Sequence, residues 1–578
     1  MAIHARLDVA GCSRGCALIA FALLLMLLPQ HGLSQGVTFP ADRAREVKQL
    51  FDAGRWQDIV DAVPQSSKEP AELELDRGLA LARLQKWSAA KAALEAGHQG
   101  YPRDPRFLVE LAGIAYIEKH YSSAKKDLRQ ALALDPRDAY ANNLLASIYF
   151  LEGNLDAALK YWNRAGKPKL TDLIYDPAPK LDPLILDRAF RFSPGMVWKR
   201  DEYLTTQTEL QSLNLFPSTF YELAAQPDGS FKLIWHDGQQ TGLTGMNLQS
   251  ALTLLRGLPY QEVYPEVYDI DRKGLNWLSM IRWDDEKRRL SSEVASPWAE
   301  NPKRRLRMYF DGRNENWNIA NRLIPGVAAP AGFNMRRAVM GAEVRAIESW
   351  RWQWNVGAEY SYRDFRTLQG IPGQAGPFFE NGSGLTVRSG VQRSLIRFPE
   401  RRFNLNAAAM GETGRFYGNG LGVYGRVQGS LAASWLPKAT GDDYGVTTML
   451  RAGGTFGQVP FDELYMLGFD RDNDLWMRGH FALRNGQKGN APMGRNFILS
   501  NSDFEKVVYH GPFFEVKVGP FLDTGDIYDP SQFFGSRKWL TDTGLQATVK
   551  VLGNFAVVLG YGKDLRSGNN TFYSTVLR

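Results

Sequence analysis

The sequence has almost no cysteine, and both of its cysteines, Cys12 and Cys16, lie close to the N-terminus. The rest of the chain therefore offers no thiol for a disulfide, a thiolate metal site or a cysteine nucleophile. Long apolar runs are also scarce. After residue 28, no run reaches the roughly 18 apolar residues that a membrane-spanning helix needs. If this chain enters a membrane, we expect a closed β-barrel, because a barrel pairs every backbone group without a helix.

Dense basic tracts and catalytic motifs are missing as well. The net charge is +7, from 69 Lys and Arg against 62 Asp and Glu. This mild balance indicates no nucleic-acid partner. No Gly-x-Ser-x-Gly motif and no metal-ligand spacing accompany the histidines, so we expect no enzyme, no cofactor and no metal. An outer-membrane hydrolase is the enzymatic alternative. The histidines beyond the N-terminal segment are His98, His120, His236, His480 and His510.

Residues 1–35 have the pattern of a secretory signal peptide. Arg6 and Arg14 precede an apolar core at residues 16–28, and small residues follow it. The core is too short for a spanning helix and is followed by a cleavage-like end. We therefore expect export from the cytoplasm, with a retained membrane anchor as the alternative.

Residues 40–170 show helical spacing and repeat with a period of 34, which places Ala90, Ala124 and Ala158 at equivalent positions. Tyr149 and Trp162 belong to the best copy of the repeat. The period resembles that of the tetratricopeptide repeat, in which small residues pack at helix crossings. This resemblance implies a helical solenoid whose concave face binds clients or accessory proteins.

Prolines at residues 166–183 indicate a linker, followed by an extended piece at 185–192. A helix is expected over 201–213 with Asp201 as its cap, and then a hairpin around residues 226–229. This order over 184–240 resembles the later part of a POTRA domain, a periplasmic module, and implies client binding by strand addition. A small spacer without client contact is the alternative, and residues 241–261 are a connector.

From residue 262 to 578 the helical period gives way to alternation. In residues 350–363, aromatic and apolar side chains share one strand face and polar side chains the other. We expect lipid to cover this apolar strand face. The pattern therefore predicts an antiparallel transmembrane β-barrel of about 16 strands. The fold class is therefore multidomain: an all-α repeat solenoid, a small α+β module and a C-terminal barrel.

Two short motifs lie in the last part of the chain. Trp476 to His480 contains an Arg-Gly pair, and Phe521 to Gly525 reads Phe-x-Asp-x-Gly at the end of a strand that points Phe521 and Asp523 inward. Their order and spacing resemble the BamA/TamA-type bacterial surface-antigen barrels. That resemblance implies a loop folded into the lumen, and its residues here are Arg478, Gly479, Phe521, Asp523 and Gly525. His480 departs from the aromatic residue usual after the glycine.

The resemblance implies a non-enzymatic outer-membrane protein with its N-terminal domains in the periplasm. Such a protein assembles, inserts or translocates polypeptides, so its partners are outer-membrane lipid, unfolded or secreted polypeptide clients and periplasmic accessory proteins. A second hypothesis is an export pore for polysaccharide or other secreted material, with the repeats as a periplasmic guide.

Overall fold

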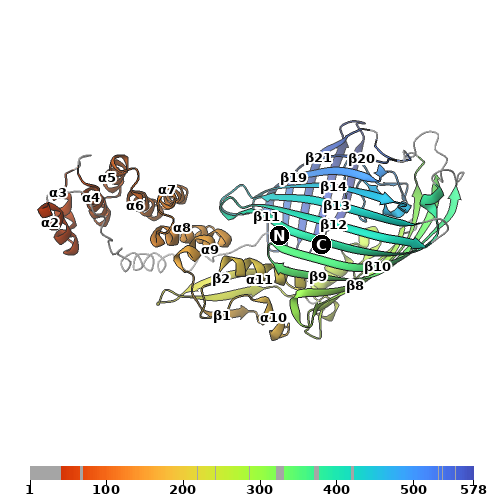
Figure 1. Ribbon diagram of the computed structural model, residues 1–578, viewed down its shortest axis with the longest axis horizontal. Coiled ribbons are helices and arrows are strands. Elements are labelled where there is room, and N and C mark those ends of the chain that lie inside the picture. The colour runs from red at the N-terminus through yellow and green to blue at the C-terminus, as the bar shows by residue number, and fades with distance from the viewer. Residues whose placement is uncertain are drawn as a thin grey trace.

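The computed structural model describes residues 41–577, apart from 65–68, 218, 241, 246, 285–286, 321–330, 370–375, 418–421, 531–532, 537 and 553–554. The expected signal segment lies outside the described residues. A helical arm, a small sheet and a barrel follow one another along the long axis (Figure 1). None of the described helices is both long and apolar enough to span a membrane.

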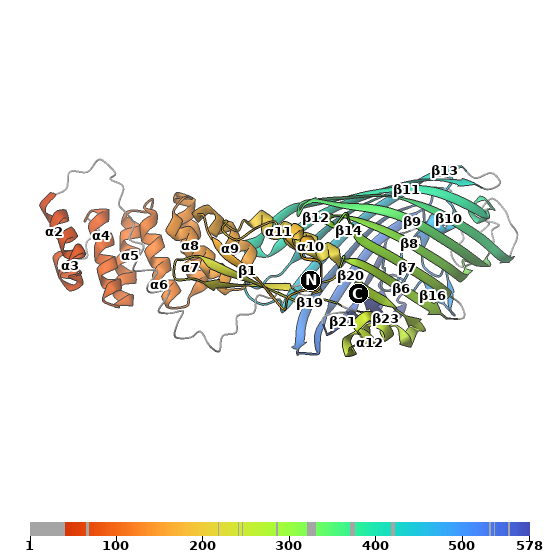
Figure 2. The same ribbon diagram turned by 90° about the horizontal axis from the view of Figure 1, so that it is seen from below.

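Among the residues that the structure describes, eight helices form the arm. They stack in antiparallel pairs (Figure 2). Asp104 and Asp138 begin two of them, because each side chain accepts a hydrogen bond from a backbone N–H of the first turn. The pairs pack closely: a Cβ added at Gly97 would lie 2.3 Å from the Phe107 ring. The helices are α2 (Ala41–Asp52), α3 (Trp56–Ala62), α4 (Ala71–Arg83), α5 (Trp87–Gly100), α6 (Pro105–Ile117), α7 (Tyr121–Leu134), α8 (Ala139–Leu151) and α9 (Leu155–Trp162).

The five residues expected to pack the repeats all lie in the core of the arm. Ala90, Ala124 and Ala158 are 0% exposed, and Tyr149 and Trp162 are 2% and 3% exposed. The three alanines sit on α5, α7 and α9, the second helix of successive pairs. A larger side chain at these positions has no room, because each alanine is fully buried in a closely packed core.

A three-stranded mixed sheet follows the arm. Its elements are β1 (Leu170–Asp176), α10 (Pro183–Ala189), α11 (Arg200–Leu213), β2 (Thr219–Ala225) and β3 (Phe231–Asp237). The strand order is β1-β3-β2, with β1 parallel to β3. The strand β1 lies in the stretch expected to be a linker, so that expectation is wrong. Local sequence does not reveal this strand, because its partner β3 is more than fifty residues away.

Two other expectations in this region are wrong. The segment expected to be extended forms helix α10, since Asp182 accepts a hydrogen bond from the N–H of Leu184 and Pro183 occupies the first turn. Asp201 does not cap α11, which begins at Arg200. Asp201 instead accepts a hydrogen bond from Trp350 Nε1 at 3.1 Å.

The barrel is closed and its long strands are antiparallel. In the described part of the chain, eighteen strand segments belong to the ring or pair with it. Helix α12 (Leu248–Leu255) precedes the ring. The segments are β4 (Glu262–Val263), β5 (Glu266–Ile270), β6 (Leu275–Trp283), β7 (Lys287–Trp298), β8 (Asn301–Asn318), β9 (Gly332–Ser349), β10 (Trp352–Gln369), β11 (Gly382–Phe398), β12 (Phe403–Tyr417), β13 (Val423–Trp435), β14 (Tyr444–Gly457), β16 (Leu483–Arg484), β17 (Gln487–Lys488), β19 (Asn496–His510), β20 (Phe514–Tyr528), β21 (Leu540–Val551), β22 (Phe555–Asp564) and β23 (Asn570–Leu577). The first strand is split into two, β14 pairs directly with β19, and the short hairpin of β16 and β17 in the loop between them pairs with β8.

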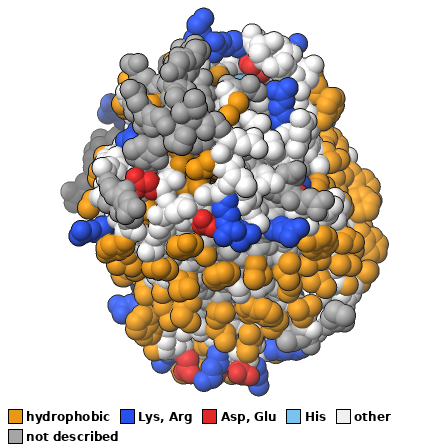
Figure 3. Space-filling model, turned by 90° about the vertical axis from the view of Figure 1, so that its right-hand side faces the viewer, with side chains coloured by type: hydrophobic (Ala, Val, Ile, Leu, Met, Phe, Trp, Pro, Cys, Tyr) orange, Lys and Arg blue, Asp and Glu red, His pale blue; other side chains and the backbone are white. Residues whose placement is uncertain are grey.

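The two faces of the barrel wall differ in polarity. On β10, Val356 and Tyr360 point outward and are 47% and 45% exposed, whereas Glu359 and Arg363 point inward and are 3% and 0% exposed. Hydrophobic side chains form a broad field on the flank of the barrel (Figure 3). On this strand the apolar side chains therefore lie on the outside, and the charged side chains of Glu359 and Arg363 are enclosed.

Ion pairs join the helical arm to one end of the barrel. Asp156 on α9 accepts hydrogen bonds from Arg200 Nε at 2.5 Å and from Arg397 Nε at 2.6 Å. Lys160 on the same helix pairs with Glu400 in the turn between β11 and β12. These contacts place the repeats at the end of the barrel that carries its short turns.

Candidate functional site: a loop anchored in the barrel lumen

Residues 458–495, between β14 and β19, turn into the barrel. The loop contains two short strands that pair with each other, β15 (Tyr465–Met466) and β18 (Met493–Gly494). Phe461, Leu467 and Met477 are each 0% exposed and belong to apolar clusters that include wall residues such as Phe333 and Leu499, so the loop packs against the inside of the ring. Loop side chains meet inward-facing residues of strands on opposite sides of the barrel, and the loop therefore occupies the lumen.

A row of polar side chains crosses four neighbouring strands at one height. Asn501 on β19 is paired in register with Asp523 on β20, Asp523 with Asp542 on β21, and Asp542 with Asp564 on β22. Asp523 and Asp542 are 0% exposed and Asp564 is 5% exposed. Because directly opposed residues point to the same face of a sheet, these carboxylates form a buried lumenal ladder. Three buried carboxylates in a row need donors or cations nearby.

Arg478 supplies the first of these partners. Its Nε lies 2.9 Å from Asp523 Oδ2 and its Nη2 lies 2.6 Å from Asp523 Oδ1, which makes a bidentate pair. The backbone N–H of Arg478 donates to the same carboxylate at 2.9 Å, and Asn501 Nδ2 donates at 2.7 Å. Arg478 also pairs with Asp503, and its guanidinium lies 3.8 Å above the Phe521 ring.

The next two loop residues reach the next two aspartates. Gly479 N donates to Asp542 Oδ2 at 2.6 Å. The ring of His480 lies between two carboxylates, with Nδ1 3.0 Å from Asp542 and Nε2 3.5 Å from Asp564. The Arg-Gly-His tip thus lies along the ladder and contacts its aspartates on three consecutive strands, β20, β21 and β22.

The close approach of loop and wall explains two of the glycines. A Cβ at Gly479 would lie 2.7 Å from Asp542 Cγ, and a Cβ at Gly562 would lie 2.1 Å from the carbonyl oxygen of Arg478. The Cβ at Gly479 would also lie 2.7 Å from the backbone nitrogen of Asp564, so at both glycines a backbone atom would have to shift. Gly525 is close to the wall itself, since its Cβ would meet the carbonyl oxygen of Ile498 at 2.7 Å.

A second anchor was not foreseen from the sequence. Asp472 of the loop, with a side chain 1% exposed, lies within 2.9 Å of three basic groups of the wall: Arg282 Nη1, Lys287 Nζ and Arg289 Nη1. Its neighbour Asp470 pairs with Lys287 at 3.0 Å. Here the loop carries the acids and the wall the bases, the reverse of the Arg478 anchor.

A third anchor has the same polarity as the second. Glu463 of the loop lies 2.8 Å from Arg337, 3.1 Å from Arg363 and 2.9 Å from Arg426. Asp462 pairs with Arg337 at 3.0 Å. Together the three anchors bind the loop to strands around most of the ring. The position of the loop in the lumen is therefore held by charge pairs as well as by apolar packing against the wall.

One local signal could have revealed part of the ladder. Asp542-Thr543-Gly544 on β21 repeats the Asp523-Thr524-Gly525 pattern of β20. The two aspartates are register partners. The remaining anchor residues carry no such signal, because isolated charges on strands are ordinary in a polar-lined barrel.

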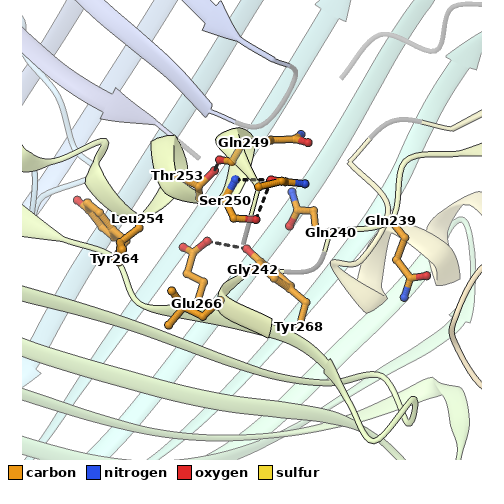
Figure 4. Close-up of a pocket in the computed structure, with 12 residues that line it drawn as sticks. Gln239, Gln240, Gly242, Gln249, Ser250, Thr253, Leu254, Tyr264, Glu266 and Tyr268 are labelled. Atoms are coloured by element: carbon orange, nitrogen blue, oxygen red, sulfur yellow. Dashed lines mark hydrogen bonds between the residues drawn. The ribbon is translucent and has the colours of Figure 1, made fainter. Parts of the chain in front are cut away.

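A shallow pocket lies at the junction of the small sheet and the barrel (Figure 4). Glu266 on its wall already accepts hydrogen bonds from Arg256 Nη2 and Tyr268 Oη, each at 2.7 Å. Ser250 donates its N–H to Asn247 Oδ1 at 2.8 Å. These contacts join α12 to the first barrel strand, and the pocket reads as a structural junction.

Comparison with known proteins confirms the repeat. The tetratricopeptide repeat family matches residues 119–169. No curated protein matches the sequence.

Three solved structures resemble the chain more broadly. CdiB from Escherichia coli is 11% identical with a TM-score of 0.47, covering 71% of this chain and 75% of that one. CdiB from Acinetobacter baumannii is 11% identical with a TM-score of 0.42, covering 94% and 100%. BamA from Haemophilus ducreyi lacking POTRA domains 1–3 is 9% identical with a TM-score of 0.42, covering 72% and 85%. The chain thus combines an N-terminal tetratricopeptide repeat with a barrel that matches BamA and CdiB structures.

Proposed function

We propose that this protein is an outer-membrane β-barrel of BamA/TamA type that assembles, inserts or translocates polypeptides. The observation that carries the proposal is the lumenal anchor formed by Arg478 against Asp523 and by Gly479 against Asp542. A tip bound to three consecutive strands holds the loop, and with it that part of the barrel wall, in one arrangement. Releasing the tip would let loop and wall move together, which suits a barrel that handles polypeptides.

The outer surface supports the membrane location. Large apolar side chains that stand in water on many strands would invite aggregation, and lipid removes that cost. Phe572, Leu545 and Leu559 on the last three strands are 79%, 63% and 50% exposed. The barrel would then sit in the outer membrane, with the helical arm and small sheet in the periplasm.

The small sheet supports a polypeptide-handling role through its strand edges. Its elements run in the order strand, helix, helix, strand, strand, and the order β1-β3-β2 leaves β2 at an edge of the sheet. We assign it as a POTRA-like module that spans residues 170–237. An edge strand offers unpaired backbone groups to an extended client, which is the physical basis of strand addition.

The helical arm supports recruitment. Tetratricopeptide repeats stack into a curved surface, and such surfaces bind peptides and proteins. The ion pairs of Asp156 with Arg200 and Arg397 hold the last repeat at the barrel end beside the small sheet. A client or accessory protein bound to the arm would therefore be delivered to the barrel.

The test is a deletion strain complemented with wild-type protein or with the Arg478→Ala variant. Quantitative proteomics of the outer-membrane and secreted fractions should show a selective loss of polypeptides in the deletion strain. Wild type should restore them, and the variant should restore them only in part. Unchanged polypeptides together with a lost extracellular polysaccharide would contradict the proposal and favour the export-pore hypothesis.

Conductance separates the two hypotheses independently. A polysaccharide exporter needs a continuous lumen, whereas here loop residues such as Phe461 and Met477 are buried within the ring. Wild-type protein in a planar bilayer should show low conductance. Weakening the anchor with Arg478→Ala should raise it.

A further inference from the structure

The aspartates on β21 and β22 have a different basic partner from the aspartate on β20. Asp523 is met by a guanidinium, but Asp542 and Asp564 are met by the imidazole of His480. One ligand atom from each of these three residues lies within 4.8 Å of the other two. The three side chains come from the loop tip, β21 and β22, so they converge only because the loop is folded inward.

The charge of this cluster is unbalanced. Within ion-pair distance, the described residues offer Asp542 and Asp564 one basic side chain between them, that of His480. Two enclosed carboxylates therefore face at most one positive charge. Asp564 also accepts hydrogen bonds from Arg566 N and Ser567 Oγ, neither of which carries charge. Such a site gains from a further cation.

One carboxylate oxygen points into the cluster without a hydrogen bond. Asp542 is 0% exposed, and its Oδ2 accepts a hydrogen bond from Gly479 N. Its Oδ1 is a buried atom that makes no hydrogen bond, although His480 Nδ1 lies 3.0 Å away. A buried acceptor left in this state costs on the order of 1–3 kcal/mol. A metal ion bound to that oxygen would remove the cost.

The donor set and the spacing select the class of ion. One imidazole with two carboxylates suits zinc and similar transition metals, whereas Mg²⁺ and Ca²⁺ take oxygen ligands. Tetrahedral bonds of about 2.0–2.1 Å put neighbouring ligand atoms roughly 3.3 Å apart. His480 Nε2 and Asp564 Oδ2 are 3.5 Å apart.

We infer that His480, Asp542 and Asp564 form a site for one divalent cation of the zinc class. The ion would tie the tip of the lumenal loop to β21 and β22, next to the Arg478 anchor on β20. It would add a metal-dependent clasp to the barrel. The inference concerns metal binding by these side chains and does not depend on what the barrel transports.

The test uses the full-length chain in detergent, stripped with a chelator and titrated with Zn²⁺ by calorimetry. Wild type should bind one Zn²⁺ per chain, and its unfolding temperature should rise on binding. His480→Phe keeps a ring of similar size but no ligating nitrogen, and it should lose at least about tenfold in Zn²⁺ affinity. Asp564→Asn should behave similarly.

His510→Ala is the matched control. His510 lies near a barrel turn, where Nδ1 is 3.1 Å from Glu515, and it is remote from the loop tip in sequence. Its variant should bind Zn²⁺ as wild type does. The inference is overturned if wild type binds no Zn²⁺, or if His480→Phe, shown to be folded by its circular dichroism, binds Zn²⁺ as tightly as wild type.

Discussion

Replacing Arg478 by alanine removes the centre of the first anchor. The guanidinium makes two hydrogen bonds to Asp523, at 2.6 and 2.9 Å, and one to Gln546 at 3.1 Å, and it pairs with Asp503. Its own side chain is 4% exposed and that of Asp523 is 0% exposed. The substitution therefore leaves a fully enclosed carboxylate without its counter-ion.

The magnitude follows from that stranded charge. Breaking a buried ion pair by removing one partner costs roughly 3–5 kcal/mol, even though the intact pair adds little net stability. Loss of the contact between the guanidinium and the Phe521 ring adds about 0.5–2 kcal/mol. Asn501 and the backbone N–H of residue 478 still donate to Asp523, which keeps the total near the lower end. We expect destabilisation of about 3–4 kcal/mol.

The assay is unfolding of the purified barrel in detergent, followed by tryptophan fluorescence and by heat-dependent mobility in gels. Arg478→Lys is the graded variant. It keeps the charge but not the planar fork, so its loss should be intermediate. Arg393→Ala removes an exposed arginine on β11 and should leave the transition unchanged.

Amide hydrogen exchange locates the part of the barrel that Arg478→Ala destabilises. Amides of the loop should exchange faster in Arg478→Ala, while those of β8 to β11 keep their protection. The reasoning is refuted if Arg478→Ala unfolds with wild-type stability and its loop amides remain protected. A uniform loss over the whole barrel would also contradict a local anchor.

Three further predictions concern other contacts. Gly562→Ala pushes a Cβ to 2.1 Å from the backbone of the loop tip and should cost about 1–3 kcal/mol, whereas Gly411→Ala, which has open space, should be neutral in the same unfolding assay. Asp156→Ala leaves two arginines unpaired at the junction of arm and barrel. It should speed amide exchange in α9 without lowering the heat stability of the barrel. Burial raises the pKa of the Glu110 carboxyl from 4.5 to about 7. Between pH 4.5 and pH 7 the folded arm therefore holds a proton that the unfolded chain releases, so the free energy of unfolding falls as pH rises through this range. Glu110→Gln should therefore gain stability over wild type from pH 5 to pH 8, on the order of 2 kcal/mol by circular dichroism, and an equal difference at both pH values would contradict the assignment.

Local patterns were sufficient for the periodic parts of the chain. The 34-residue period places Ala90, Ala124 and Ala158 in the core of the arm, because each repeat buries the same face against its neighbour. Alternation in β10 and β20 separates outward apolar side chains from inward polar ones, because a strand has a period of two. Both signals depend only on residues close in sequence.

Local sequence patterns were not sufficient for the small sheet, because its first strand pairs with a partner that is distant in sequence. The sequence predicts a linker where the strand Leu170–Asp176 forms, because the hydrogen-bond partner of that strand is the distant β3 at Phe231–Asp237. It predicts an extended piece where the helix Pro183–Ala189 forms, although the Asp-Pro start is a recognised helix signal. The first error could not be corrected from local sequence, whereas the second could.

The residues of the lumenal site also fall into two groups: those that the sequence predicted and those that only the tertiary structure brought together. The sequence by itself determined, through strand parity, that Asp523 points inward, and the resemblance of the two motifs to BamA/TamA-type barrels predicted Arg478 as its partner. Only the tertiary structure decided that Asp523, Asp542 and Asp564 share one height, and that Asp472 and Glu463 are enclosed by basic groups from distant strands. The physical reason is that strand register and the path of a long loop are set by contacts around a closed ring. Parity tells which way a side chain points, but register tells what it meets.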